Sequence, residues 1–461
     1  MAPDRHFLKV DGKNIVNGDG ETVVLRGIGL GGWMNMENFI TGYPCNEEAQ
    51  RDIIREVLGE EKYEFFFDKF LEYFFTADDA DHFASLGMNA LRLPLNYRHF
   101  EDDMNPMVIK ESGFKHLDRV IDLCAERNIY TILDLHALPG YQNQDWHSDN
   151  PTHKALFWKH RHFQDRVVNL WEAFAKRYKD NPRVAGYNPI NEPADPTGRV
   201  IMPFYERLFK AIRDIDPDHI IFLEGNRYSL DFGMFGEPWP NVVYAAHDYP
   251  APGRIDGEAY PGTTQGIYYD KDVIEKNLLA TCSYMLERGT PVWVGEFNPG
   301  YLGIPEADEM RFQLLSDQLD IFNKHGFSWS AWTCKDIGYQ GLVYAAPDSK
   351  WMDRIRPALE KKARLAVDSW TGKDTNIRHI IGPLEETFAK EFPDYNPFPF
   401  GVPYQIKRLV RNILLSEPLL AEFGECFRGI TEKEIDELMQ SFLFRNCVQR
   451  KKMAEILAAH A

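Results

Sequence analysis

Long hydrophobic runs are missing from this chain of 461 residues. A membrane-spanning helix needs roughly 18 to 20 predominantly apolar residues, and no stretch approaches that length, so we expect no membrane span. The opening MAPDRHFLKVDGKN carries charges at positions 4, 5, 9, 11 and 13 and holds no apolar run of signal-peptide length. The chain as written predicts a cytoplasmic protein, although a chain whose signal had been cleaved would look the same.

Cysteine is scarce and scattered. Six cysteines occur in the whole chain and none forms a CxxC pair, so a disulfide scaffold is excluded and a reducing compartment is sufficient for them. The GxSxG nucleophile elbow and the phosphate-binding P-loop are also missing, which disfavours acyl and phosphoryl transfer. We found no internal repeat and no low-complexity segment.

Basic residues are fewer than acidic ones. Lys and Arg number 52 against 70 Asp and Glu, a formal net charge of −18. Such a protein is repelled by phosphate backbones, so we expect no nucleic-acid partner. The composition is 44% hydrophobic and 13% aromatic, enough for a large buried core, and the oligomeric state is left open.

Short apolar runs alternate with longer amphipathic segments up to about residue 335. The segment 114–128 is typical of the latter, with Leu117, Val120, Ile121 and Cys124 spaced by three and four residues. Eight runs have the character of strands buried on both faces: 23–29, 88–94, 130–136, 184–190, 219–225, 242–247, 291–296 and 327–332. Eight such strands separated by helices predict an α/β fold, the (β/α)8 TIM barrel.

A doubly wound open sheet is the alternative fold. It would require a Gly-rich phosphate loop that leads into a helix, with an acidic residue about twenty positions later. The one Gly-rich stretch, GIGLGGW (27–33), has neither, so the barrel is preferred.

The two ends of the chain differ from the alternating region. The opening segment reads as a hairpin turning at Asn17–Gly20, and we expect it to plug the barrel floor. After residue 368 the alternation stops and helical patterns follow, including 404–415 and 431–444, with a capping box at Thr431 and Glu434. We therefore divide the chain into a catalytic barrel, 1–368, and a helical C-terminal extension, 369–461, expected to serve packing or oligomer contacts.

Functional side chains of such barrels sit where strands end. Glu192 follows the fourth strand and Glu296 ends the seventh, so the two carboxyl groups should face each other across the mouth. A carboxyl pair among aromatic and neutral polar groups is what acid/base-assisted glycoside cleavage requires. The other polar or aromatic residues at strand ends are Arg92, His136, Asn191, Glu224, His247, Tyr249, Trp329 and Trp332.

Several of these residues have simpler explanations. Glu224 competes for a catalytic role, but a structural ion pair is the favoured interpretation. Four histidines suggest a metal site: His147, His153, His160 and His162. Their spacing matches neither HExxH nor a Cys/His zinc pattern, so we predict no metal and no cofactor.

Six segments together resemble glycoside hydrolase family five, a retaining (β/α)8 family, and most closely its exo-β-1,3-glucanase or β-glucosidase type. They are LRGIGLGGWMNMENFIT (25–41), LGMNALRLPLNY (86–97), ILDLHALPGYQN (132–143), INEP (190–193), HDY (247–249) and VGEF (294–297). The resemblance covers roughly residues 5–345 and leaves the extension unmatched.

The resemblance implies roles for individual residues. Glu192 in Asn-Glu-Pro matches the general acid/base, Glu296 the nucleophile, and Arg92 the arginine that keeps the nucleophile ionised. Glu37 matches an acidic residue that grips the non-reducing-end sugar, which favours an exo-acting pocket. Further substrate contacts are implied for Asn191 (the sugar 2-hydroxyl), Tyr249, His136, His247 and the stacking platform Trp332, with Trp329 the less favoured platform.

Two segments depart from the family pattern. After PGYQN the chain continues QDWHSDNPTHKALFWKH (144–160), a loop that should frame the leaving-group side. The insert 43–75 and the opening without a signal fit an enzyme of short, imported glycosides better than a cell-wall enzyme.

The sequence thus predicts a retaining exo-β-glycosidase acting on β-glucosides or short β-glucans by double displacement. A β-mannosidase, a diglycosidase or a transglycosylase on the same site is the alternative. A carbohydrate-binding barrel without activity is the weakest hypothesis, because a binder does not need both Glu192 and Glu296.

Overall fold

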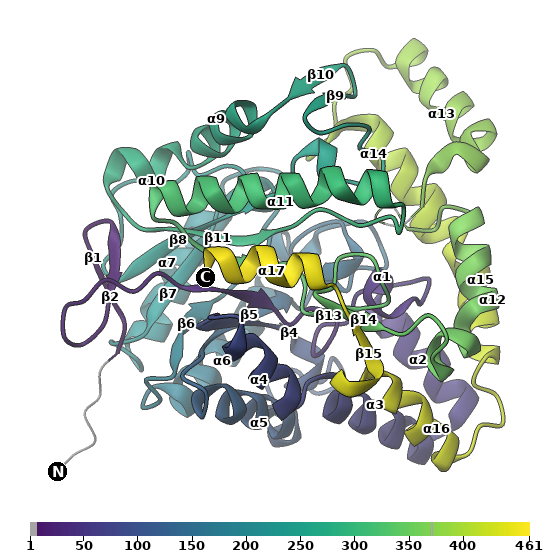
Figure 1. Cartoon of the computed structure of the whole chain (residues 1–461), viewed down its shortest axis with the longest axis horizontal. Helices are drawn as coiled ribbons and strands as arrows, with labels where there is room; N and C mark the ends of the chain where they lie inside the picture. The colour runs from purple at the N-terminus through teal and green to yellow at the C-terminus, as the bar shows by residue number, and fades with distance from the viewer. Residues whose placement is uncertain (1–6, 369, 371) are drawn as a thin grey trace.

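The computed structural model describes residues 7–368, 370 and 372–461, and its centre is a closed barrel of eight parallel strands (Figure 1). Around the barrel the strands follow the order β11-β12-β3-β4-β5-β6-β7-β8, which is chain order closed into a ring. The strands are β3 (Arg26–Gly29), β4 (Ala90–Asn96), β5 (Tyr130–Ala137), β6 (Val184–Asn188), β7 (Ile220–Glu224), β8 (Val242–Asp248), β11 (Val292–Phe297) and β12 (Ser328–Ala331). The predicted (β/α)8 fold is confirmed.

Burial on both faces explains the apolar strands. Every residue of β4 and of β11 is buried, because one face lines the barrel interior and the other packs against the outer helices. The barrel interior is filled rather than open: Ile132, Phe222 and Trp293 belong to one buried cluster inside it.

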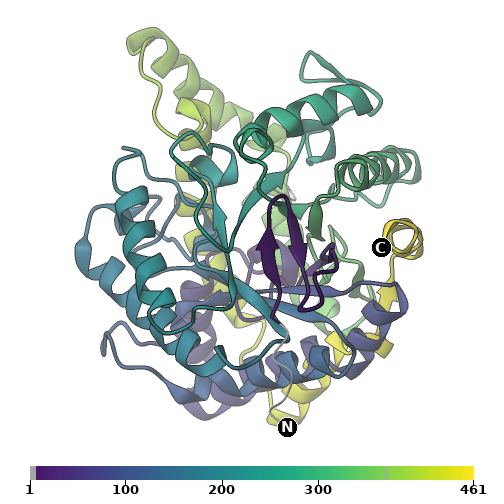
Figure 2. The same cartoon turned by 90° about the vertical axis from the view of Figure 1, so that its left-hand side faces the viewer.

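The amino-terminal hairpin closes the barrel floor. Strands β1 (Lys9–Asp11) and β2 (Asn14–Val16) pair antiparallel, and Leu8 and Ile15 pack into the cluster of the barrel interior; Figure 2 shows the hairpin across this end. The predicted turn at Asn17–Gly20 is present and brings Val16 and Thr22 into an antiparallel bridge, but an earlier turn joins β1 to β2. The chain reverses at Gly12, whose φ of +56° favours glycine, whereas Asn17 and Gly20 form a second reversal, joined by a backbone hydrogen bond.

Helices surround the barrel. Between β3 and β4 lie α1 (Asn38–Thr41), α2 (Glu47–Leu58), α3 (Glu60–Phe74) and α4 (Ala77–Ser85). The later crossovers carry α5 (Phe114–Ala125), α6 (Arg161–Tyr178), α7 (Ile201–Arg213), α8 (Asn226–Ser229), α9 (Lys271–Thr281), α10 (Ser283–Arg288) and α11 (Pro305–His325), with a small ribbon of β9 (Gly262–Thr264) and β10 (Ile267–Tyr269). In the part of the chain that the structure describes, no helix has the length and apolar character needed to cross a bilayer.

The remainder of the chain is helical and packs back onto the barrel. It comprises α12 (Lys350–Arg364), α13 (Arg378–Glu391), α14 (Gly401–Arg408) with a π-helical continuation (Leu409–Leu414), α15 (Ser416–Glu425), α16 (Glu432–Met439) and α17 (Lys451–His460). Helix α15 packs on α2, and α16 packs on α3. Strand β15 (Cys447–Gln449) joins β13 (Lys335–Asp336) and β14 (Val343–Ala345) in a three-stranded sheet.

The last helix completes the outer ring. Figures 1 and 2 both show α17 alongside α11, and Asn323 of α11 donates a hydrogen bond to the carbonyl of His460. On its other side Ala461 lies beside Gly87, just after α4. Helix α17 therefore occupies the place of the eighth outer helix. The division at residue 368 stays a prediction.

Candidate active site

A cavity of about 700 Å³ opens at the carboxyl ends of the barrel strands. Its inner part is lined by the predicted site residues Glu37, His136, Glu192, His247, Tyr249, Glu296 and Trp332. Its outer wall comes from the loop after β7 and from the C-terminal extension, which contributes Trp370, Phe400, Tyr404, Lys407, Arg408 and Arg411. Helix α14, which supplies part of this wall, lies at the end of the barrel opposite the β1–β2 hairpin (Figure 1).

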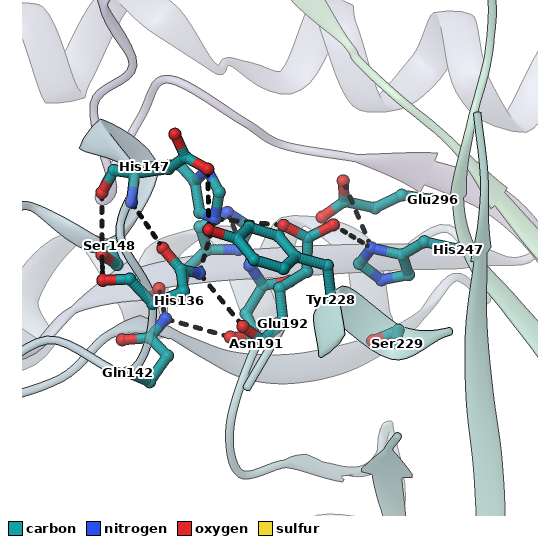
Figure 3. A network of polar contacts seen from close by, with 12 residues as sticks. His136, Gln142, His147, Ser148, Asn191, Glu192, Tyr228, Ser229, His247 and Glu296 are labelled. Carbon is teal, nitrogen blue, oxygen red and sulfur yellow. Dashed lines mark hydrogen bonds and ion pairs between the residues drawn. The ribbon is translucent and has the colours of Figure 1, made fainter. Parts of the chain in front are cut away.

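Glu192 and Glu296 face each other across this cavity (Figure 3). Together with a ring nitrogen of His247, one oxygen from each lies within 4.8 Å of the others. Glu296 belongs to β11, while Glu192 follows β6 with a φ of +46°, a strained conformation of the kind that functional sites retain. The Glu192 N–H donates to Oε2 of Glu224 at 2.6 Å, which holds this backbone in place.

Arg92 is the hub of the buried polar network. It is fully buried on β4 and its guanidinium donates to Glu296, to Glu224 at 3.1 Å and to Asn191 Oδ1 at 2.7 Å. Burial lowers the pKa of Arg92, but the carboxylates of Asp134, Glu296 and Glu224 outweigh it and raise that pKa. Glu224 is therefore a structural ion-pair partner, as the sequence favoured, and it does not line the cavity.

Neighbouring groups fix the orientation of Glu296 and of the sugar-facing residues. The Tyr249 hydroxyl donates to Glu296 Oε2 at 2.9 Å. Because Asn191 Oδ1 accepts from Arg92, its amide nitrogen must donate to His136 Nε2 at 3.2 Å. The other ring nitrogen of His136 then donates to Asp134 at 2.7 Å. Burial lowers the pKa of His136 well below its ordinary value, so the ring is neutral and fixed in one tautomer.

Glu37 approaches the same space from the first strand loop, where it precedes α1. Its side chain is buried, Oε1 has no hydrogen-bond partner, and the nearest ring nitrogen, His136 Nε2, is 3.9 Å away. Burial raises the pKa of Glu37 to about 8, helped by the negative charge of Glu296. At neutral pH Glu37 is mainly a neutral carboxylic acid that can donate a hydrogen bond into the cavity.

The two tryptophans of β12 and its end differ in position. Trp332 lines the cavity and stacks on His136, with ring centroids 5.4 Å apart and planes 8° apart. Trp329 is fully buried against Phe297 on the other side of the strand. Trp332, not Trp329, is therefore available as a stacking platform.

His147 is a site residue that the sequence analysis did not identify. Its Nε2 lies 3.0 Å from Glu192 Oε2, while His247 Nδ1 lies 2.7 Å from Glu192 Oε1. The other members of the histidine group stay apart from it: His153 packs near Tyr404, and His160 pairs with His162. The departure of the 144–160 loop from the family pattern was the available signal.

The electrostatics of Glu192 depend on these two imidazoles. Burial raises the pKa of Glu192, and hydrogen bonds from His147 and His247 lower it overall when both rings donate. Burial also lowers the pKa of His247, but Glu296, Glu224 and Glu192 raise it well above its ordinary value. His247 is therefore a cation that donates to Glu192 Oε1.

The outer wall was also missed, because the sequence assigned no chemistry to 369–461. Phe400 lies against Tyr228 and Tyr404, with centroids 5.2 and 5.0 Å away. Tyr404 and Arg408 both contact Asp145 of the 144–160 loop. Aromatic and basic residues concentrated in 395–411 are the pattern that could have indicated a binding surface.

A closed parallel barrel with two facing carboxylates at its mouth defines a barrel glycoside hydrolase. A sequence model of the Cellulase family (glycosyl hydrolase family 5) matches residues 61–338. The chain is 48% identical to a beta-xylosidase of Phanerodontia chrysosporium over 99% of this chain and 98% of that protein. It is 28% identical to a probable glucan 1,3-beta-glucosidase A of Aspergillus clavatus over 52% of this chain and 59% of that protein.

The chain therefore belongs to glycosyl hydrolase family 5, and it is a retaining glycoside hydrolase. Among solved structures, the rutinosidase of Aspergillus niger matches with a TM-score of 0.54 and 18% identity, over 68% of this chain and 90% of that one. The match to an endogalactoceramidase has a TM-score of 0.51 and 19% identity, over 72% and 75%. At such identities these two structures support the fold alone.

Proposed function

We propose that this protein is a retaining exo-β-glycosidase that removes one sugar from the non-reducing end of short β-glycosides. The observation that carries the proposal is the Glu192–Glu296 pair, whose nearest oxygens lie within 4.8 Å in a cavity walled on both sides. Retaining enzymes hold their carboxyl groups about 5 to 5.5 Å apart, whereas inverting enzymes need roughly 6.5 to 9.5 Å to admit a water molecule.

In the proposed reaction Glu296 Oε attacks the anomeric carbon and forms a glycosyl ester while the bond to the aglycone oxygen breaks. Glu192 gives its proton to that departing oxygen. Glu192 then takes a proton from water as the water oxygen attacks the same carbon, which releases Glu296 as carboxylate and the sugar with its β-configuration retained. Arg92 and Tyr249 hold the Glu296 carboxylate in position through the reaction.

The glycone would be held by neutral donors and an aromatic face. Asn191 is positioned by Arg92 to meet the sugar 2-hydroxyl, Trp332 offers a platform, and protonated Glu37 offers a donor at the closed end. The wall formed by Trp370, Phe400 and Tyr404 narrows the space above the two carboxyl groups, which supports short glycosides rather than a polymer as substrates.

Two glycones are supported by separate observations. The resemblance of the strand-end motifs favours a β-glucoside, and the relative named a beta-xylosidase, similar over the full chain, favours a β-xyloside. The two sugars share their equatorial hydroxyls and differ in the hydroxymethyl group on the ring, so the contacts of Asn191 and Trp332 serve both.

Matched aryl glycosides test the proposal. Hydrolysis of aryl β-glucoside, β-xyloside, β-mannoside and β-galactoside should single out one or both of the first two, and Glu296→Gln should abolish turnover while circular dichroism stays unchanged. NMR of the first-formed sugar should show the β-anomer. Appreciable turnover by the folded Glu296→Gln variant, or an α-product, would contradict the assignment. Release of a disaccharide, or transfer to an acceptor sugar, would instead establish a diglycosidase or a transglycosylase.

A further inference from the structure

The 144–160 loop places the imidazole of His147 beside Glu192, the proposed acid/base residue. The hydrogen bonds of His147 decide whether its Nε2 or its Nδ1 carries the ring proton. His147 lies on a 3₁₀ turn (Trp146–Ser148) and its backbone carbonyl accepts from Asn35. Its Nε2 is within hydrogen-bond distance of both Glu192 Oε2, at 3.0 Å, and Asn143 Nδ2, at 2.8 Å. One ring nitrogen cannot donate to the first and accept from the second at the same time.

The orientation of the Asn143 amide is set by the backbone. Its Oδ1 accepts from the N–H of Asp145 at 2.9 Å, and its Nδ2 donates to the carbonyl of Glu192 at 3.1 Å. The amide group that faces His147 is therefore NH₂, a donor without a lone pair for hydrogen bonding. Consequently Nε2 of His147 presents its lone pair and the ring is neutral, with its proton on Nδ1.

A lone pair on His147 Nε2 favours the protonated form of Glu192. An ionised Oε2 at 3.0 Å would set lone pair against lone pair in a buried site, whereas a protonated Oε2 donates to it. Oε1 already accepts from the His247 cation at 2.7 Å. The two oxygens are thus distinguished: Oε1 is the acceptor and Oε2 carries the proton.

We propose that His147, held as a hydrogen-bond acceptor by Asn143, is a positioning residue that keeps Glu192 protonated at Oε2 in the resting enzyme. This inference rests on the proposed function, in which Glu192 must give a proton to the departing oxygen. Figure 3 shows His147 and His247 approaching Glu192 from opposite sides. The retaining reaction needs such a device because Glu192 has to be acidic in the first step although two imidazoles surround it.

Other titratable groups also act on Glu192, and the test leaves them unchanged. They are Glu37 before α1, Asp134 and His136 of β5, Glu224 of β7, and Glu296 of β11. The phenols of Tyr228, Tyr249 and Tyr404 complete the surroundings. None of these groups contacts Nε2 of His147 within hydrogen-bond distance.

The decisive experiment compares the pH dependence of kcat/KM in wild type and His147→Leu, on an aryl glycoside with a poor leaving group. The basic limb of this profile reports the pKa of the protonated acid Glu192. Leucine can neither donate nor accept a hydrogen bond, so the protonated form of Glu192 loses its acceptor, and the basic limb should move to lower pH by about one unit. If His147 were instead an imidazolium donating to Glu192, the basic limb would move to higher pH, and the proposal would be overturned. An unmoved limb would likewise reduce His147 to a structural residue.

Two further variants make the result specific. Asn143→Leu removes the amide donor without adding a charge, leaves Nε2 free to carry the proton and should also shift the basic limb to lower pH. His153→Leu alters a buried histidine of the same loop that packs near Tyr404, and its profile should match wild type. A shift of equal size in His153→Leu would assign the effect to loop disturbance and contradict the proposal.

Leaving-group dependence separates this inference from the function on which it rests. Glu192→Gln should lose at least 100-fold in kcat/KM on the poor leaving group and much less on a 2,4-dinitrophenyl glycoside, because a good leaving group needs no proton. If Glu192→Gln affects both substrates equally, the acid/base assignment itself fails. If it behaves as expected and the His147→Leu profile does not move, only the role of His147 fails.

Discussion

Replacing Glu37 by glutamine should stabilise the protein, and increasingly so as pH rises. Burial raises the pKa of Glu37 from 4.5 to about 8 in the folded state, so the native protein keeps a proton that the unfolded chain releases between these two values. The unfolded state therefore binds fewer protons in this window, and the free energy of unfolding falls by about 1.4 kcal/mol per pH unit on account of this group. Glutamine keeps a donor at this position and has no such penalty.

The size of the effect follows from the same shift. Relative to wild type, Glu37→Gln should gain about 1 kcal/mol at pH 5 and about 3 kcal/mol at pH 7. Urea unfolding followed by tryptophan fluorescence at both pH values measures this difference. Glu258→Gln, an exposed carboxyl at the mouth of the same cavity, is the control and should stay within about 0.5 kcal/mol of wild type. An equal gain at pH 5 and pH 7 would refute a pKa raised by burial.

Three further predictions concern the C-terminal extension and the buried core. Phe400→Ala should lower kcat/KM about tenfold for glycosides with a bulky aromatic aglycone and leave methyl glycosides unaffected. Phe392→Ala, a change at an exposed residue outside the cavity, should alter kcat/KM for neither substrate. If Phe400→Ala lowered kcat/KM equally for both substrates, Phe400 would not lie on the aglycone side. Leu457→Ala, in the fully buried face of α17, should lower the free energy of unfolding in urea by about 2 to 5 kcal/mol. The control Leu414→Ala, at an exposed residue, should leave that free energy almost unchanged. A negligible change for Leu457→Ala would mean that α17 does not unfold together with the barrel. Lys335→Met removes a buried ammonium 2.6 Å from Asp79 and should cost about 3 to 5 kcal/mol, an expectation that an unchanged urea midpoint would contradict.

Much of the fold was predictable because its signals are local. The eight barrel strands are runs in which almost every residue is buried, such as β5 and β11, and burial on both faces leaves a continuous apolar run in the sequence. Asn17–Gly20 and Gly12 are both turn sequences and both form turns, and only the first of these was predicted. Only the pairing of β1 with β2 shows that the first reversal lies at Gly12.

The outer part of the site was not predictable in the same way. Tyr404 contacts Asp145 across 259 positions of sequence, and the two residues carry no shared pattern that would announce the contact. The spacing of the histidines in the 144–160 loop matched no metal motif, and nothing in it indicated that His147 lies beside Glu192. Helix α17 resembles any amphipathic helix, and nothing in its own sequence indicates that it returns to lie beside α11.

The sequence by itself determined the barrel and the strand-end positions of Glu192 and Glu296, because strand periodicity and the rule that parallel strands end at one face are properties of each short segment. Only the tertiary structure decided what surrounds those carboxyls: the wall of Phe400 and Tyr404, the buried and protonated Glu37, and the imidazole of His147 held by Asn143. The physical reason is that burial and hydrogen-bond valence depend on groups brought together from distant parts of the chain. The protonation states that such a reaction requires are therefore a property of the folded molecule.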